Sequence, residues 1–189
     1  MIDKDIGFIG LGNVGSKLAR NILQAGYNLF IHDINENTSN ELVNKGAIWK
    51  NSVKDIIDNT SLIITCLPSP QAVTEVVEGK SGMVNYINDK HLWIEMSTTD
   101  EKKMIRLSKL IESKGANVLE APVTGGQHRA ESGNISVLTA GKRENFNRAF
   151  PILSEIGFQI LYCGKLGNAS TLKVVTNYLA SINLLSIGE

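Results

Sequence analysis

The stretch Gly10-Leu11-Gly12-Asn13-Val14-Gly15 decides the fold of this 189-residue chain. It follows a short apolar run at residues 6–9, typical of a buried strand, and opens a helical pattern over residues 13–25. In such an arrangement Gly10 permits the tight turn, Gly12 lets the backbone approach a pyrophosphate, and Gly15 lets helix and strand pack closely. Free N–H groups and the helix dipole attract the phosphates. The pattern therefore predicts a dinucleotide-binding turn, and the alternative is a glycine-rich turn without a ligand.

An acidic residue, Asp33, follows a second predicted strand at residues 28–32 and lies 23 residues after Gly10. An acceptor at this place can bond the 2′-hydroxyl of an adenosine ribose. A 2′-phosphate about 4 Å from the carboxylate would be opposed by about 1 kcal/mol in water and about 4 kcal/mol at an intermediate dielectric. No Arg or Lys occurs at residues 34–36 to reverse this repulsion. NAD is therefore expected in preference to NADP; in the alternative, Asp33 is a surface acid that tolerates either.

Short apolar runs alternate with amphipathic helical segments along the rest of the chain. Further strands are predicted near residue 47 and at 61–66, 91–95, 117–120, 135–140 and 157–163. Further helices are predicted at 36–45, 52–58, 100–113, 144–156 and 166–187. Runs that are apolar on both faces and separated by helices indicate a parallel sheet covered on both sides. We expect a doubly wound α/β (Rossmann) domain over residues 1–164, followed by a long helix that begins within residues 165–189.

The composition excludes several classes of protein. The chain is 42% apolar and 20% charged, and its 19 Lys and Arg balance 19 Asp and Glu, which is ordinary for a globular domain. Zero formal net charge removes the long-range field that nonspecific nucleic-acid or membrane-surface binding requires. No run of about 18 apolar residues occurs, and the charged N-terminus does not fit a signal peptide. We expect a cytoplasmic protein with a small-molecule ligand and neither nucleic acid nor membrane as a partner.

The two cysteines, Cys66 and Cys163, lie far apart and have no second thiol or histidine at metal-ligand spacing. This spacing predicts neither a disulfide framework nor a metal site. Both cysteines end apolar, strand-like runs, so we expect buried structural thiols.

The predicted helix at residues 166–187 carries more apolar side chains than one packed face can bury. At about 25 cal/mol per Å² and about 100 Å² for each large side chain, exposing three or four of them forfeits about 8 kcal/mol. We therefore expect a partner chain over this helix, or a longer protein of which this chain is the first part.

Two further segments carry candidate substrate and catalytic groups. Thr124, Gly125 and Gly126 follow the predicted strand at 117–120, and their hydroxyl and backbone N–H groups would suit a substrate carboxylate. Lys173 and Asn177 lie one turn apart on the long helix and so share a face. They suggest a proton donor and its orienting partner; the alternative is a solvated lysine beside a surface asparagine.

Five motifs together resemble the β-hydroxyacid dehydrogenase family, which is related to 6-phosphogluconate dehydrogenase. The motifs are the glycine string at residues 7–15, Leu67-Pro68, Met96-Ser97-Thr98, the segment 121–126 and the Gly167/Ala169/Lys173/Asn177 pattern. In this order they cover essentially the whole chain. Three residues depart conservatively from the usual pattern of the family, namely Val14 for methionine, Glu120 for aspartate and Thr124 for serine.

The resemblance implies an oxidoreductase that transfers a hydride between NAD and a small 3-hydroxy acid or its semialdehyde. Lys173 is then the expected proton donor or acceptor and Asn177 its neighbour, while Thr124, Gly125 and Gly126 contact the substrate. The implied cofactor contacts are Gly10, Leu11, Gly12, Asn13, Val14, Gly15, Asp33, Leu67, Pro68 and Thr98, the last three around the nicotinamide and its ribose.

Members of the family carry a second, all-helical domain after the long interdomain helix on which this chain ends, and their active site is the cleft between the two domains. We therefore expect a truncated chain that binds NAD and turns over weakly alone. Either a homo-oligomer or the missing C-terminal domain would pack on residues 166–187. The alternative function is a non-catalytic dinucleotide-binding or assembly module. Imine reduction is a further alternative, although relatives with that activity lack the lysine.

Overall fold

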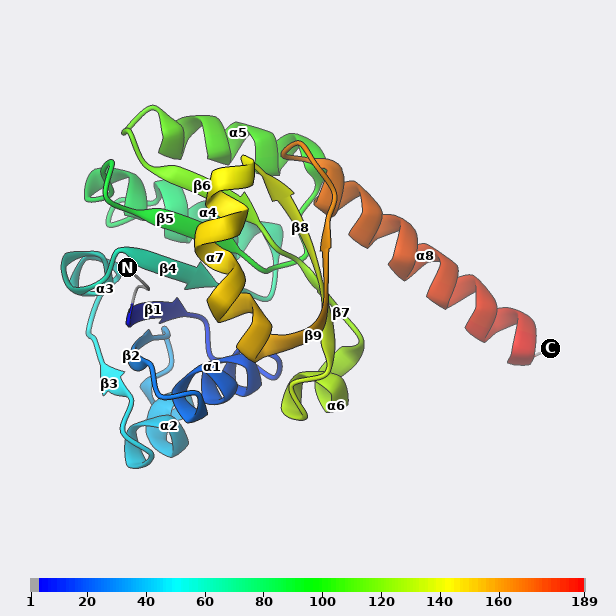
Figure 1. The fold of residues 1–189 in the computed structure, drawn as a ribbon, viewed down its shortest axis with the longest axis horizontal. Helices are drawn as coiled ribbons and strands as arrows, with labels where there is room; N and C mark the ends of the chain where they lie inside the picture. The colour runs from blue at the N-terminus through cyan, green and yellow to red at the C-terminus, as the bar shows by residue number, and fades with distance from the viewer. Residues whose placement is uncertain (1–3, 189) are drawn as a thin grey trace.

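The computed structural model describes residues 4–188, which form one sheet with helices on both faces (Figure 1). The strands are β1 (Asp5–Ile9), β2 (Asn28–His32), β3 (Ile48–Trp49), β4 (Leu62–Thr65), β5 (Leu92–Glu95), β6 (Asn117–Glu120), β7 (Val123–Thr124), β8 (Ile135–Gly141) and β9 (Gly157–Tyr162). The helices are α1 (Gly15–Gln24), α2 (Asn40–Asn44), α3 (Val53–Asn59), α4 (Pro70–Glu78), α5 (Glu101–Glu112), α6 (Gly126–Glu131), α7 (Arg143–Ile156) and α8 (Asn168–Gly188), with short 3₁₀ segments η1 (Glu36–Ser39) and η2 (Met83–Asn85).

The sheet order is β3-β2-β1-β4-β5-β6-β8-β7, and β9 pairs with β8. Strands β1 to β6 are parallel, with β2 and β3 on one side of β1 and the later strands on the other. The order in which successive strands are added to the sheet therefore reverses between β1 and β4. In doubly wound sheets, ligands bind outside the carboxyl ends of the strands at this point.

The sheet is parallel as far as β6, but β8 runs antiparallel to both β6 and β7. The chain leaves β6 and forms β7 and α6 beyond the carboxyl end of that strand. Strand β8 starts there, opposite β7, and runs back until it pairs with the end of β6. No helix crosses the sheet between β6 and β8, so the condition for a parallel pair is not met.

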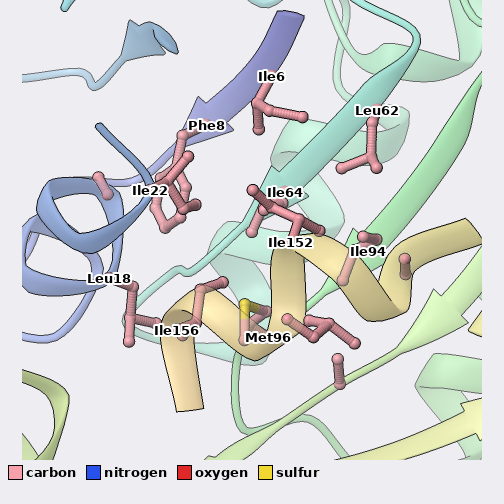
Figure 2. Packing of buried hydrophobic residues seen from close by; sticks show 14 of the residues in the cluster. Ile6, Phe8, Leu18, Ile22, Leu62, Ile64, Ile94, Met96, Ile152 and Ile156 are labelled. Carbon is pink, nitrogen blue, oxygen red and sulfur yellow. The ribbon is translucent and has the colours of Figure 1, made fainter. Parts of the chain in front are cut away.

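The side chains of each central strand alternate between two apolar cores, one on each face of the sheet. Ile6 and Phe8 of β1 pack with α1 and α7, whereas Ile9 packs with α3, α4 and α5. Figure 2 shows the first core, in which Ile64 of β4 and Ile156 of α7 lie in the same layer as Phe8. Burial on both faces explains why the strands are apolar runs rather than alternating patterns, as the sequence predicts.

The predicted helices need correction at four places. Helices α4 and α6 were not predicted, although Ser69 caps α4 by accepting a bond from the backbone N–H of Ala72 at 3.1 Å, and Pro70 starts it. The predicted helix at residues 36–45 is split into η1 and α2. The long helix begins two residues later than predicted because Gly167, at φ +98°, has a non-helical backbone.

Helix α8 leaves the sheet and extends away from the rest of the domain (Figure 1). Only Ala169, Ser170 and Lys173 among its described residues are buried. The exposed fractions of its large apolar side chains run from 37% for Leu172 to 84% for Ile187. The surplus of apolar surface predicted for this helix is therefore confirmed.

A buried network joins the ends of β4 and β5 to the loop after β4. The Thr65 hydroxyl donates to Oε2 of Glu95 at 2.5 Å and accepts a bond from Trp93 Nε1 at 2.8 Å. The backbone N–H of Ser97 donates to Oε1 of Glu95 at 2.6 Å, and the Ser97 hydroxyl accepts a bond from the N–H of Leu67 at 2.8 Å. The carboxyl of Glu95 thus helps to fix the start of the Leu67-Pro68 loop.

Burial raises the pKa of Glu95 to about 7, against the opposing effect of its hydrogen bonds to Ser97 and Thr65. A carboxyl whose folded pKa is raised contributes stability that is complete below its unfolded pKa and is lost as pH rises through the folded pKa. We expect Glu95 to lower the free energy of unfolding by about 3 kcal/mol between pH 4.5 and pH 8. Urea unfolding of wild type and Glu95→Gln across this range measures the effect.

Glu95→Gln should flatten the pH dependence because the amide does not ionise. The matched control is Glu144→Gln, which removes an exposed carboxyl in the first turn of α7 and should keep the wild-type slope. A Glu95→Gln protein with the wild-type pH slope contradicts the prediction.

Candidate active site

A cavity of about 930 Å³ lies at the carboxyl ends of β1, β2 and β4. It is lined by eight of the ten residues predicted to hold the cofactor, namely Gly10, Gly12, Asn13, Val14, Gly15, Asp33, Leu67 and Pro68. Leu11 is buried beside the cavity rather than in its wall, and Thr98 is exposed. The structure therefore brings the glycine turn and Asp33 together with Leu67 and Pro68 around one cavity.

The three glycines of the turn have different surroundings. A Cβ on Gly10, whose φ is +98°, would lie 2.4 Å from the carbonyl oxygen of Cys66. A Cβ on Gly15 would lie 2.1 Å from the carbonyl oxygen of Gly10. Both glycines are thus required for packing. Gly12 differs because a Cβ there would meet no protein atom within 4 Å, so this glycine leaves open space toward the cavity.

The start of α1 offers free donors to that space. The carbonyl oxygens of Gly12 and Val14 accept the first helical bonds, from Ser16 and from Lys17 and Leu18. Within residues 4–188, the backbone N–H groups of Asn13 and Val14 have no protein acceptor. Unpaired N–H groups at the N-terminus of a helix bind phosphate. The open space at Gly12, next to the unpaired N–H groups of Asn13 and Val14, fits the pyrophosphate of a dinucleotide.

Asp33 is held in place at the end of β2. Its Oδ2 accepts a bond from the backbone N–H of Leu11 at 2.6 Å, and its Oδ1 accepts one from the N–H of Asn35 at 2.9 Å. Each carboxylate oxygen can accept more than one hydrogen bond, so a ribose hydroxyl could still be bound. The contact with Leu11 ties the acidic residue directly to the glycine turn.

Several cavity residues were not predicted from the sequence. Ala72, Glu75 and Val76 line the cavity from α4, and they were missed because α4 itself was not predicted. The Ser-Pro pair that begins α4 is a recognisable helix start and could have revealed them. Gln127 of α6 lines the same cavity and carries no sequence signal for that role.

The predicted substrate residues lie outside the lining of this cavity. Thr124 ends β7 and is half-buried, and Gly125 and Gly126 follow it with φ of +131° and +77°. Helix α8 lies against β7 and β8, so the loop and the helix that carries Lys173 are neighbours. The structure thus brings the loop at residues 124–126 close to the helix that carries Lys173, and neither lines the cavity.

Lys173 is 8% exposed on a helix that is otherwise mostly exposed. Burial lowers the pKa of its ammonium. Among the described residues, none forms a hydrogen bond or ion pair with Nζ, so the amine at the end of this buried side chain has no counter-ion there. Asn177, one turn further along, is exposed.

Sequence reasoning missed the structural role of Glu120. This fully buried residue ends β6, and its carboxylate accepts hydrogen bonds from the first turn of α8. Burial raises the pKa of Glu120, although its bonds to Ser170, Ala169 and Gly167 oppose that shift. A carboxyl at the end of an apolar strand is the only signal for it in the sequence.

Other predicted features have a mixed outcome. Cys66 and Cys163 are half-buried rather than fully buried, although burial raises the pKa of the Cys66 thiol to about 12. In the part of the chain that the structure describes, no three His, Cys, Asp or Glu side chains cluster as metal ligands. None of the described helices is long and apolar enough to cross a membrane.

Comparisons with known proteins agree with this geometry. The rat mitochondrial 3-hydroxyisobutyrate dehydrogenase is 34% identical over 97% of this chain and 55% of its own length. The solved 3-hydroxyisobutyrate dehydrogenase of Mycobacterium tuberculosis with L-serine has a TM-score of 0.91 and 25% identity, over 99% of this chain and 63% of its own. Psf3 in complex with NADP⁺ and 2-OPP has the same TM-score and identity, over 95% of this chain and 63% of its own. The chain spans about half the length of the curated relatives it matches.

These relatives confirm the resemblance to β-hydroxyacid dehydrogenases. The matching family model is the NAD binding domain of 6-phosphogluconate dehydrogenase, over residues 5–164. The match takes in the glycine turn, Asp33, the Leu67-Pro68 loop and the loop at residues 124–126, and it ends just before α8. This chain belongs to the family of the NAD binding domain of 6-phosphogluconate dehydrogenase.

Proposed function

We propose that the chain is the cofactor-binding part of an NAD-dependent β-hydroxyacid dehydrogenase that interconverts a small 3-hydroxy acid and its semialdehyde or keto partner. The observation that carries this proposal is Lys173, a buried amine with lowered pKa and no counter-ion among the described residues, on a helix beside the predicted substrate loop. A buried, unpaired lysine is costly for folding, and such groups concentrate at functional sites.

In this proposal the cofactor lies in the 930 Å³ cavity, with its pyrophosphate at Gly12 and the start of α1. Asp33 binds the adenosine ribose, and Leu67, Pro68 and Thr98 lie around the nicotinamide and its ribose. The remaining proposed cofactor contacts are Gly10, Leu11, Asn13, Val14 and Gly15. When bound, NAD supplies the hydride acceptor and its reduced form the hydride.

The protein's own residues bind the substrate and move the proton. Thr124, Gly125 and Gly126 hold the substrate carboxylate through the hydroxyl and backbone N–H groups. In the reducing direction the Lys173 ammonium polarises the carbonyl oxygen and donates a proton to it. In the oxidising direction the neutral amine accepts the hydroxyl proton, and Asn177 orients the reacting group.

The proposed division of the chain is a dinucleotide-binding domain over residues 1–164 and the first part of an interdomain helix over 165–189. Because Asn177 and the substrate loop are open to solvent, this chain alone should bind the dinucleotide and turn over weakly. A second domain or a second copy would cover α8 and exclude water. A cytoplasmic location stays a prediction, since the rat relative is mitochondrial.

A second candidate function is a dinucleotide-binding or assembly module without catalysis. It is favoured by one observation, that neither Lys173 nor the substrate loop lines the cofactor cavity. Turnover of 3-hydroxy acids by the wild type, and its loss on substitution of the lysine, separate the two candidates.

Lys173→Ala should lower turnover of 3-hydroxy acids by about 100- to 10,000-fold, because general acid–base catalysis contributes that much. The affinity for NAD should stay within about twofold, since Lys173 does not line the cavity. Steady-state rates with a panel of 3-hydroxy acids and calorimetric titration with NAD measure the two effects. Lys165→Ala, which removes an exposed lysine just before α8, is the control and should behave as wild type. Turnover that survives in Lys173→Ala would overturn the role of Lys173, whereas NAD binding without turnover in the wild type would favour the module.

The rate of oxidation should rise with pH, because only the neutral amine of Lys173 can accept the proton. The midpoint of this rise should lie below the ordinary lysine pKa of about 10.4, since burial lowers the pKa of Lys173. The rate of reduction should fall over the same interval as the ammonium is lost. Profiles of kcat/KM against pH in both directions test this, and a midpoint at or above 10.4 counts against it.

Asp33→Asn should reduce the preference for NAD over NADP. The amide keeps one acceptor oxygen for Leu11 or Asn35 but removes the charge that opposes a 2′-phosphate. A repulsion of about 1 to 4 kcal/mol corresponds to about 5- to 1000-fold in the ratio of the two dissociation constants. Glu36→Gln, three residues further on and exposed, is the matched control. Equal affinity of the wild type for both dinucleotides would overturn the expected preference.

A further inference from the structure

We propose that Glu120 is the positioning residue for Lys173. Its buried carboxylate fixes the first turn of α8 against the end of β6 and thereby sets where the lysine lies relative to the substrate loop. The catalytic meaning of this placement rests on the proposed function of Lys173, but the placement itself does not.

The contact consists of four hydrogen bonds that meet at one carboxylate. Oε1 of Glu120 accepts from the backbone N–H of Gly167 at 2.5 Å and of Ala169 at 3.1 Å. Oε2 accepts from the backbone N–H of Ser170 at 3.1 Å and from its hydroxyl at 2.6 Å. The first N–H groups of a helix have no partner within the helix, and a negative charge there is favourable. One side chain thus caps α8, whose 21 residues begin at Asn168.

Few other polar contacts fix this end of the helix, although Ala169 also packs against Leu138 and Ala140 of β8. Asn168 Nδ2 donates to the carbonyl oxygen of Cys163 at 2.7 Å, and the Thr171 hydroxyl donates to the exposed carboxylate of Glu101 at 3.3 Å. The large apolar side chains beyond Lys173 are exposed. Glu120 therefore supplies most of the polar contacts that set the direction in which α8 leaves the sheet.

The same carboxylate joins the two proposed halves of the active site. Glu120 ends β6, and residues 121–126, which include the substrate loop, follow it directly along the chain. Lys173 lies on the same side of α8 as Ala169 and Ser170, the two buried residues that Glu120 holds. The end of one strand thus sets the start of the loop and the position of the amine together.

Glu120 acts on Lys173 through position rather than charge. Burial alone accounts for the lowered pKa of the lysine, with no contribution from a nearby carboxylate. If α8 loses its cap and moves, water reaches the amine and its pKa rises toward the ordinary value. Loss of stability without displacement would not change the titration of Lys173 in the molecules that remain folded. The titration therefore separates a positioning role from a merely structural one.

The test compares Glu120→Gln, Glu120→Asp and Glu101→Gln in the otherwise unchanged chain. Glutamine has the size of glutamate, but it turns an NH₂ group toward donors that need an acceptor. Aspartate keeps the charge on a shorter side chain. Glu101→Gln is the matched control because it also removes a carboxylate bonded to the first turn of α8, but at an exposed place.

The principal readout is a pH titration of ¹³C-dimethylated lysine followed by NMR, with the Lys173 signal assigned from Lys173→Arg. It needs no turnover. We expect Glu120→Gln to raise the pKa of Lys173 and to speed amide exchange at Ala169 and Ser170 by at least about tenfold. Glu120→Asp should shift the pKa of Lys173 and the exchange rates in the same directions but by smaller amounts. Glu101→Gln should match the wild type in both measurements. NAD affinity should be unchanged in all three variants because Glu120 does not line the cavity.

Where turnover is measurable, kcat/KM of Glu120→Gln should fall by about 100-fold, as expected when a reacting group is displaced by about 1 Å. A wild-type titration and wild-type exchange in Glu120→Gln overturn the inference. If that variant does not fold, Glu120→Asp decides: a raised pKa of Lys173 supports the inference and a wild-type value overturns it. A raised pKa together with full turnover of Lys173→Ala means that the positioning stands and the proposed function fails.

Discussion

The close approach of three backbone segments at the glycine turn is the constraint on which the structure depends. Gly15 lies so near the carbonyl of Gly10, and Gly10 so near the carbonyl of Cys66, that neither place has room for a Cβ. This contact brings the start of α1 against the carboxyl ends of β1 and β4. The cavity, its free N–H groups and the nearby carboxylate of Asp33 all follow from that approach.

Behind this turn, the carboxyl ends of adjacent strands carry polar residues that organise the loops that follow. Thr65 pairs in register with Glu95, and Glu95 with Glu120. Glu95 binds the segment that supports Leu67, and Glu120 binds the start of α8. A row of buried groups across the sheet thus connects the core to the Leu67-Pro68 loop on one side and to the helix that carries Lys173 on the other.

The sequence predicted the order of strands and helices well because both faces of the sheet are covered and every central strand is apolar. It predicted that the glycines and Asp33 would lie close together, as they do around the cavity, because they belong to one βαβ unit with short-range geometry. It could not predict the antiparallel β8, since Ile135 to Gly141 reads as an apolar run in either direction. The role of Glu120 was also out of reach, because its partners lie 47 to 50 residues away. Lys173 was singled out by spacing and by the family resemblance, and the structure adds that its side chain is 8% exposed.

The exposed length of α8 has a thermodynamic consequence for anything that packs against it. Beyond Lys173 this segment relies on its own backbone hydrogen bonds, and a free helix of about 12–15 residues is only marginally stable in water. Contact with a neighbouring surface would remove the apolar side chains of α8 from water and would also suppress fraying at the end of the helix. The folding of this part of α8 and its association with a partner surface are therefore coupled. The conformational entropy that the segment loses when it becomes rigid reduces its affinity for that surface.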